Sequence, residues 1–348
     1  MELFQITNRQ EWRRVVSSFD CYDFYHTFDF NYISYCNNEG DPVLFYLRDR
    51  TNNGKFALPI LFREISQKDG HRDATSVYGY PGPLVEGNID IKSCRLKIID
   101  RLRKLKCVSL FSRVNSFTVA NSYLSPLKTS KAGETVYIDL LSCEEAQRDQ
   151  YRNSHIRIIK KLRKKGIKSW IDNSNAGVDE FFKLYEGAMN RLCANKYYYF
   201  NKEYFYSLMA SKDFYANLIF CGLDGKTICG GIFTLCSGIV QYHLGATTDN
   251  YQKLSPSIFM FDSVRLWGIK QNARIFHLGG GLSGTCDSLL HFKKGFSKNR
   301  ANFMTLKWIV NNDRYIELTK NRAKEMQVDW KVIANGSFFP AYRAVKSY

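Results

Sequence analysis

Two pairs of apolar runs along the chain are separated by residues typical of tight turns. Asn-Gly and Asp-Gly tolerate the positive φ that a two-residue turn requires, so each pair predicts a β-hairpin. The expected strands are Pro42–Arg48 with Phe56–Arg63 around Asn53-Gly54-Lys55, and Asn217–Gly222 with Thr227–Leu235 around Asp224-Gly225-Lys226.

Helical patterns precede both hairpins, at Gln10–Phe19 and Phe28–Asn37 and again at Val178–Leu192 and Lys202–Ala210. The order helix, helix, hairpin therefore occurs twice, which predicts two copies of one mixed α/β unit. Thr135–Leu140 is an expected strand, and the polar stretch after it places the seam near residues 140–150. We expect domains at 1–145 and 146–348.

The second half continues the pattern. Its further predicted elements are strands at Ile239–Ala246, Arg274–Leu278 and Phe303–Val310, and helices at Ser257–Gln271 and Arg314–Gln327. Apolar residues at helical spacing, with Pro256 near the start, mark the first of these helices.

Charge and composition narrow the class of protein. The 348 residues include 45% hydrophobic residues, enough for a large core, and carry a formal charge of +17. That excess favours a polyanionic partner, although a basic enzyme without one fits equally well. Ten cysteines without C-x-x-C spacing predict reduced thiols and no metal site. Neither a leader nor a membrane-length apolar run is visible, so we expect a cytoplasmic protein without a transmembrane segment.

The densest positive charge lies in Tyr151–Trp170, with eight Lys or Arg and no Asp or Glu. Ile156, Ile159 and Leu162 share one face of a predicted helix that Asn153 or Ser154 can cap and Gly166 can end. The opposite face either contacts phosphates or is simply solvated. The candidate phosphate-binding residues are Arg157, Lys160, Lys161 and Lys164.

Two aromatic stretches are further candidates. Tyr78-Gly79-Tyr80-Pro81-Gly82-Pro83 predicts a rigid turn whose tyrosines either contact a substrate or pack into the core. Arg191 is followed by an aromatic run that includes Tyr199, and an Arg beside aromatic rings can clamp an anion or end a helix.

Gly279, Gly280 and Gly281 follow an apolar strand, and Phe292-Lys293-Lys294-Gly295-Phe296 comes shortly after a short helical segment. Glycines without Cβ atoms let the backbone approach a bound molecule closely. Burial of the two phenylalanines would hold Lys293 in a defined place. This combination predicts a site for a polar, anionic group.

Several enzyme classes lack their signatures in this chain. No G-x-S-x-G, no P-loop and no strand-linked G-x-G-x-x-G occurs, which weighs against α/β-hydrolases, P-loop NTPases and dinucleotide oxidoreductases. None of the six histidines has a spaced Asp and Ser partner. His243 and His277 lie on predicted strands and are expected to be hydrogen-bonded core residues.

Taken in order, four motifs resemble the Fem-type acyltransferases, a branch of the GNAT superfamily. They are Asp73–Leu84 with its Tyr-Gly-Tyr-Pro-Gly-Pro core, the basic helix after Leu140, the Tyr185, Met189, Arg191 and Tyr199 spacing, and His277–Gly281 with Phe292–Phe296. The resemblance covers nearly the whole chain. It implies two tandem GNAT-like domains of the α/β (α+β) class, each a mixed, mostly antiparallel sheet flanked by helices.

The resemblance also implies transfer of an acyl or aminoacyl group from aminoacyl-tRNA or an acyl thioester to an amine, on a cell-envelope or polysaccharide precursor. By motif position Lys293 corresponds to the lysine that is associated, in the tRNA-using members of the family, with stabilising the transition state. Tyr78, Tyr80, Arg191, Tyr199 and Gly279–Gly281 are the corresponding substrate-binding candidates. No tightly bound cofactor is implied; acyl-CoA or aminoacyl-tRNA is the co-substrate.

The chain departs from this pattern in two places. It has no long heptad stretch between Asn173 and Arg274 for the helical arm of some members. The glycine turn that cradles CoA pyrophosphate is replaced by Thr248–Pro256. The implied partners are anionic: tRNA, CoA or a nucleotide- or lipid-linked sugar, with peripheral inner-membrane contact. An acyl-CoA-dependent sugar N-acetyltransferase and a non-catalytic RNA- or glycan-binding protein remain alternatives.

Overall fold

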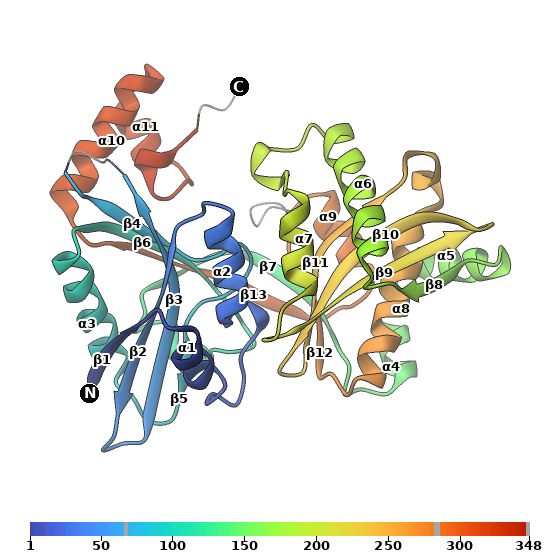
Figure 1. Cartoon of the computed structure of the whole chain (residues 1–348), viewed down its shortest axis with the longest axis horizontal. Helices are drawn as coiled ribbons and strands as arrows, with labels where there is room; N and C mark the ends of the chain where they lie inside the picture. Colours follow the sequence, from blue (N-terminus) through green and yellow to red (C-terminus); the bar gives the residue numbers. More distant parts are fainter. Residues whose placement is uncertain (66–68, 282–285, 346–348) are drawn as a thin grey trace. The chain divides into compact units, whose positions relative to one another are not determined.

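The computed structural model describes residues 1–65, 69–281 and 286–345 (Figure 1). The chain forms two compact units: unit 1 contains residues 1–132 and the chain from Phe303 onward, and unit 2 contains Gly133–Asn302. These differ from the expected domains, 1–145 and 146–348. The first boundary lies within a strand, and the last part of the chain returns to unit 1 because a late strand joins its sheet.

Unit 1 is built on a sheet with the strand order β1-β2-β3-β4-β6-β13, with β5 pairing β3. Its elements are β1 (Glu2–Ile6), α1 (Arg9–Val16), α2 (Phe28–Cys36), β2 (Asp41–Asp49), β3 (Gly54–Glu64), β4 (Arg72–Thr75), β5 (Leu84–Glu86), α3 (Ile91–Lys104), β6 (Cys107–Val114), β13 (Arg300–Ile309), α10 (Asn312–Met326) and α11 (Trp330–Ala334).

Unit 2 is built on a sheet with the order β8-β9-β10-β11-β12-β7. Its elements are β7 (Thr129–Asp139), α4 (Glu144–Asp149), α5 (Asn153–Lys164), β8 (Lys168–Ile171), α6 (Asn175–Arg191), α7 (Lys202–Met209), β9 (Tyr215–Leu223), β10 (Lys226–Cys236), β11 (Ile239–Thr247), α8 (Pro256–Lys270), β12 (Ile275–Gly279) and α9 (Ser288–Lys293).

The two sheets repeat one design. In each, a strand, two helices and an antiparallel meander are followed by a crossover helix, α3 or α8, and a parallel strand. The parallel pairs are β4 with β6 and β11 with β12. The expected duplication of a mixed, mostly antiparallel unit flanked by helices is confirmed.

The last strand of each sheet is exchanged. β7 follows β6 along the chain, yet it pairs with β12 in unit 2. β13 follows β12, yet it pairs with β6 in unit 1. Each sheet is therefore completed by a strand whose chain neighbour belongs to the other unit.

Alternating side chains give each sheet two buried faces. In unit 2, Phe220 on β9 contacts Phe181 of α6, whereas the flanking Ile219 and Cys221 belong to the core that includes Phe261 of α8. Successive residues of a strand point to opposite faces, so α6 and α8 cover opposite sides of this sheet. Within the described residues, no helix has the length and apolar character needed to cross a bilayer.

A substitution of Trp308 on β13 tests how strongly this exchanged strand is packed into unit 1. Its indole Nε1 donates to the carbonyl of Leu127 at 2.9 Å, and its ring is 4% exposed in the core of unit 1. We expect Trp308→Ala to lower the free energy of unfolding by about 3–5 kcal/mol, because it leaves a cavity and an unpaired carbonyl. Urea denaturation measures the change. Lys307→Ala, at the exposed neighbouring position, should stay within about 0.5 kcal/mol of the unaltered protein.

Candidate functional site

The two parallel strands of unit 2 pair only over their first residues. β11 and β12 are in register from Ile239 with Ile275 to Gln241 with His277, and no further. Beyond that point β11 keeps β10 as its partner, with a register shift next to Tyr242. The C-terminal ends of the two strands form what we call the strand fork, residues 242–247 and 278–280. Ligands of α/β sheets commonly bind at such carboxyl ends.

A left-handed glycine ends β12 at the fork. Gly279 has φ +80, a conformation that L side chains rarely adopt, and the pairing of β12 with β7 shifts register beside it. The backbone turns here and presents the carbonyl of Gly280 to Lys293. One of the three predicted glycines therefore has a definite conformational role, while substrate contact by Gly279, Gly280 and Gly281 stays a prediction.

Lys293 ends α9, whose first turn is capped by the Asp287 carboxylate accepting from the Leu290 N–H. The Lys293 side chain reaches the fork: Nζ donates to the Gly280 carbonyl at 2.6 Å and lies 5.6 Å from the ring centroid of Tyr242. Only 5% of the residue is exposed. A buried ammonium with an aromatic face beside it is a preorganised donor for a negatively charged atom.

Burial lowers the pKa of Lys293 to about 7, and the Asp287 carboxylate opposes this shift only in part. Burial, with the nearby Lys293 charge, also lowers the pKa of His277 to about 3, and burial raises that of Tyr242 to about 12. His277 Nδ1 lies 2.8 Å from Gln241 Oε1, and His243 Nε2 lies 2.7 Å from the Tyr204 hydroxyl. Both histidines are hydrogen-bonded in the interior, as the sequence predicts.

Aromatic packing fixes the turn that carries Lys293. Phe296 is buried, and Phe292 lies against it with ring centroids 5.3 Å apart. Phe261 of α8 contacts both rings, at 5.3 and 5.2 Å. The two phenylalanines thus anchor the segment as expected, but the ring that faces the ammonium is Tyr242, which comes from a different strand.

The glycine of this motif makes room for a histidine ring. A Cβ on Gly295 would lie 1.6 Å from Cε1 of His155, which stacks on Phe296 at a centroid distance of 4.6 Å. The N–H of Arg152 also donates to the Gly295 carbonyl at 2.8 Å. Any side chain at position 295 would therefore displace either α5 or the turn that carries Lys293, which we call the lysine turn.

Arg191 and Tyr199 lie at the β11 side of the fork. The Arg191 guanidinium forms an ion pair with Asp249 and donates to the Thr247 carbonyl at 3.3 Å, where β11 ends. The Tyr199 hydroxyl donates to the Met189 carbonyl at 3.1 Å. Both side chains have intramolecular contacts, and both remain partly exposed. Their role in substrate binding stays a prediction.

Tyr78 and Tyr80 belong to unit 1, in the loop after β4. The Arg113 guanidinium lies 5.8 Å from the Tyr78 ring, and Tyr80 packs edge-on against Tyr25 and Phe303. A Cβ on Gly79, which has φ +109, would lie 2.0 Å from Cε1 of Tyr25. These contacts favour the packing role of the loop, and substrate contact by its tyrosines stays a prediction.

The basic helix forms as expected, as α5. Its buried residues are His155, Ile159 and Leu162, and the candidate cations Arg157, Lys160, Lys161 and Lys164 are exposed. Gly166 follows its end with φ +79. The predicted caps Asn153 and Ser154 are wrong: Arg152 occupies the N-cap, and its guanidinium has no acceptor that could cap the helix. The guanidinium lies 2.7 Å from Nε2 of His291 instead.

The turn before α8 offers few donors to a pyrophosphate. Asp249–Leu254 form a 3-10 helix, and Ser255 has φ +50. Pro256 at the first helical position has no N–H, and the Ile258 N–H donates to the Ser255 carbonyl. Helix N-termini bind phosphate through such backbone donors, and two of the first three donors of α8 are thus absent or already used.

Two important residues were not predicted. Tyr242 is one of several strand aromatics, and only the bulge in β11 turns it toward Lys293. His155 is a single histidine in a basic helix, and its packing over Gly295 depends on contacts far apart in the sequence. The glycine inside the Phe-Lys-Lys-Gly-Phe motif was the available signal, because a residue without a side chain between two aromatic residues suggests close packing.

Known structures share this fold. FemX matches with a TM-score of 0.68 and 13% identity, over 90% of this chain and 99% of that one. The C-terminal domain (DUF2156) assigned to a lysylphosphatidylglycerol synthetase from Agrobacterium fabrum matches with a TM-score of 0.57 and 12% identity, over 91% and 97%. L-PGS from Bacillus licheniformis matches with a TM-score of 0.55 and 12% identity, over 88% and 93%.

At these identities the likeness shows the fold alone: the chain shares the mixed α/β fold of FemX over nearly its whole length, as the resemblance implies. No protein-family model matches the sequence, and no curated protein matches it.

The buried ammonium predicts a pH-dependent stability. The pKa of Lys293 is about 7 in the folded protein, below its ordinary value of 10.5. Between these values the unfolded chain binds a proton that the folded protein does not, so the free energy of unfolding rises with pH on account of Lys293. Below pH 7 the full cost of burying the charge is present. Lys293→Met should therefore stabilise the protein at pH 6, and the gain should shrink at pH 9.

Urea midpoints at the two pH values measure this effect. Lys298→Met, at an exposed position in the same segment, is the matched control and should show no such difference. A pH-independent effect of Lys293→Met would contradict the assignment.

Proposed function

We propose that the protein is an N-acyltransferase that moves an acyl or aminoacyl group from an activated carrier to an amine. The observation that carries the proposal is the buried ammonium of Lys293 at the strand fork, held by Gly280 and beside Tyr242. Attack on an ester or thioester places negative charge on the carbonyl oxygen, and preorganised donors for that oxygen are usually the largest catalytic contribution.

In the proposed reaction the neutral amine nitrogen bonds to the carbonyl carbon, and the carbonyl electrons move to oxygen. Lys293 donates a hydrogen bond to this oxyanion from a site of low polarity, where the interaction is stronger than in water. The oxyanion then collapses, the bond to the carrier breaks, and the amine proton leaves with the carrier's oxygen or sulfur. An ammonium has three donors, and Gly280 accepts from one of them.

The carrier is proposed to be a polyanion that lies along α5. Tyr151–Trp170 accounts for the whole positive excess of unit 2, because the rest of the unit has fifteen Lys or Arg and fifteen Asp or Glu. The exposed cations of α5 can pair with successive phosphates. The start of α8 has fewer backbone donors for a pyrophosphate than a regular helix N-terminus, which favours aminoacyl-tRNA over acyl-CoA as donor.

The two neighbours with informative names fit this proposal. FemX and a lysylphosphatidylglycerol synthetase share the two-unit fold, and we propose the same general chemistry here, with an amine on an envelope or polysaccharide precursor as acceptor. Mass spectrometry of the products after incubation with charged tRNA or with acyl-CoA tests both the reaction and the donor. Absence of acyl transfer from either donor to any amine acceptor would refute the proposal.

Replacement of Lys293 gives the sharpest kinetic prediction. Lys293→Met removes the donor from the oxyanion, so we expect kcat to fall by about 10²–10³ with little change in KM. Lys294→Met is the matched control: this neighbour forms an ion pair with Glu134, and its replacement should keep kcat within a few-fold. Turnover of Lys293→Met near that of the unaltered protein would remove Lys293 from the chemistry.

Charge reversal on α5 tests the carrier. A variant with Glu at Lys160, Lys161 and Lys164 should bind tRNA at least about tenfold more weakly, and its affinity should depend less steeply on salt. Fluorescence anisotropy across a salt series measures both quantities. The control carries Glu at three exposed lysines outside this helix, Lys212, Lys226 and Lys270, and changes the net charge equally. Equal losses in the two variants would indicate a general charge effect rather than a binding surface.

A further inference from the structure

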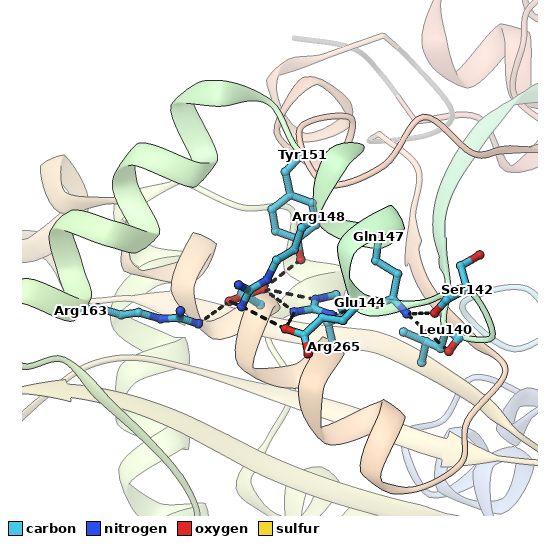
Figure 2. Close-up of polar contacts among 9 residues, drawn as sticks. Leu140, Ser142, Glu144, Gln147, Arg148, Tyr151, Arg163 and Arg265 are labelled. Atoms are coloured by element: carbon cyan, nitrogen blue, oxygen red, sulfur yellow. Dashed lines mark hydrogen bonds and ion pairs between the residues drawn. The ribbon is translucent and has the colours of Figure 1, made fainter.

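A buried ion pair lies within α8, and its arginine also binds α4. Arg265 is fully buried, and its Nε and Nη2 atoms both donate to Oδ1 of Asp262 at 3.2 Å. Arg265 Nη1 also donates to Gln147 Oε1 at 2.9 Å, and Nη2 to Glu144 Oε1 at 3.3 Å. Figure 2 shows these groups converging from α4 and α8. A buried guanidinium that lost such partners would be strongly destabilising, so this arrangement is rigid.

The Asp262 carboxylate accepts hydrogen bonds from α8, from α5 and from the segment between α4 and α5. Besides Arg265, its carboxylate accepts from Arg163 of α5 at 3.0 Å and from the hydroxyl of Tyr151 at 3.2 Å. Tyr151 stands between α4 and α5, and Figure 2 shows its hydroxyl directed toward the network. Burial, with the Asp262 charge nearby, raises the pKa of Tyr151. The phenol therefore stays protonated and keeps donating to the carboxylate.

The other side of Tyr151 contacts the lysine turn. Its ring packs edge-on against Phe296, with centroids 5.4 Å apart. On either side of Tyr151 in the chain, backbone and side chains bind the same turn: Gln150 Oε1 accepts from the Lys298 N–H at 3.0 Å and from the Ser297 hydroxyl at 2.9 Å. The Arg152 N–H donates to the Gly295 carbonyl. Residues 150–152 are thus bound to residues 295–298 by hydrogen bonds and ring packing.

We propose that Tyr151 is a positioning residue for Lys293: fixed by the buried Arg265–Asp262 pair, its ring holds Phe296 and with it the turn that aims the lysine at the strand fork. The Phe296 N–H donates to the Lys293 carbonyl at 3.1 Å, so displacement of Phe296 is transmitted to the end of α9. Tyr151 itself does not touch the ammonium. Its importance to catalysis rests on the proposed function of Lys293, although its effect on the lysine can be measured without any reaction.

The experiment is competitive labelling of the full-length protein with trace acetic anhydride across a pH series, followed by mass spectrometry of the peptide containing Lys293. Only the neutral amine reacts, so the pH midpoint of labelling reports the proton affinity of Lys293. The charged and titratable groups that face it, Asp287, His277 and Tyr242, are unaltered in every variant. Lys226, exposed at the hairpin turn, is the internal standard.

In the unaltered protein the midpoint should lie near the lowered pKa of Lys293, about 7. Tyr151→Ala frees the turn, lets water reach the ammonium and should raise the midpoint by about one pH unit or more. Tyr151→Phe keeps the ring against Phe296 but loses the hydrogen bond to Asp262, so its midpoint should rise by less than that of Tyr151→Ala. A well-folded Tyr151→Ala protein with an unchanged midpoint would overturn the proposal, and so would equal shifts in both variants.

If Tyr151→Ala does not fold, the same turn can be displaced from its other side. Gly295→Ala places a Cβ against His155 and should also raise the midpoint, whereas adding His155→Ala removes the clash and should lower it again. An unchanged midpoint in Gly295→Ala would overturn the proposal. Failure of the proposed function would give a different result. The unaltered protein would then transfer no acyl group, while the shifts in the labelling midpoint would persist.

Discussion

The candidate site in unit 2 depends on holding one ammonium in an apolar place, at a cost in stability that the rest of the unit must offset. Desolvation makes a charged Lys293 unfavourable, and the fold offsets this cost with the carbonyl of Gly280 and the face of Tyr242. Both partners exist only because the local backbone is irregular: Gly279 turns left-handed at the end of β12, and the bulge in β11 turns Tyr242. The same features that part the two strands therefore also create the surroundings of the lysine.

A polar network that does not contact Lys293 supports the turn that carries it. Arg265, Asp262 and Tyr151 form a rigid layer under α5, and aromatic rings carry that rigidity to the turn after α9. The exposed face of α5 carries most of the cations that make up the positive excess of unit 2, while its buried face stacks His155 on Phe296. One helix thus serves both the proposed carrier and the proposed catalytic group, and changes on either face can affect the other.

Local patterns predicted most of the fold. Asn-Gly and Asp-Gly marked both hairpins, and the helices α1, α2, α6, α7, α8 and α10 lie within a few residues of their expected bounds. The helix α3 was not predicted, although its sequence is amphipathic, and β6 was missed with it. The compact units differ from the predicted domains for a physical reason: the sequence of β13 does not indicate that it pairs with β6 rather than with its chain neighbour β12. For the site, motif order located Lys293 and the glycines, but the ring that faces the ammonium and the histidine over Gly295 are matters of tertiary packing.

The exchange of terminal strands bears on how the chain matures during synthesis. In unit 1, β6 has no partner on one side until β13 has been synthesised. In unit 2, β7 cannot pair until β12 has been synthesised. Nascent domains generally fold from the N-terminus onward, but here neither half can finish early. For most of translation β6 presents an open, apolar border, which is a template for wrong pairing. Such a chain would gain more than a simple tandem repeat from chaperones that shield unfinished sheets on the ribosome.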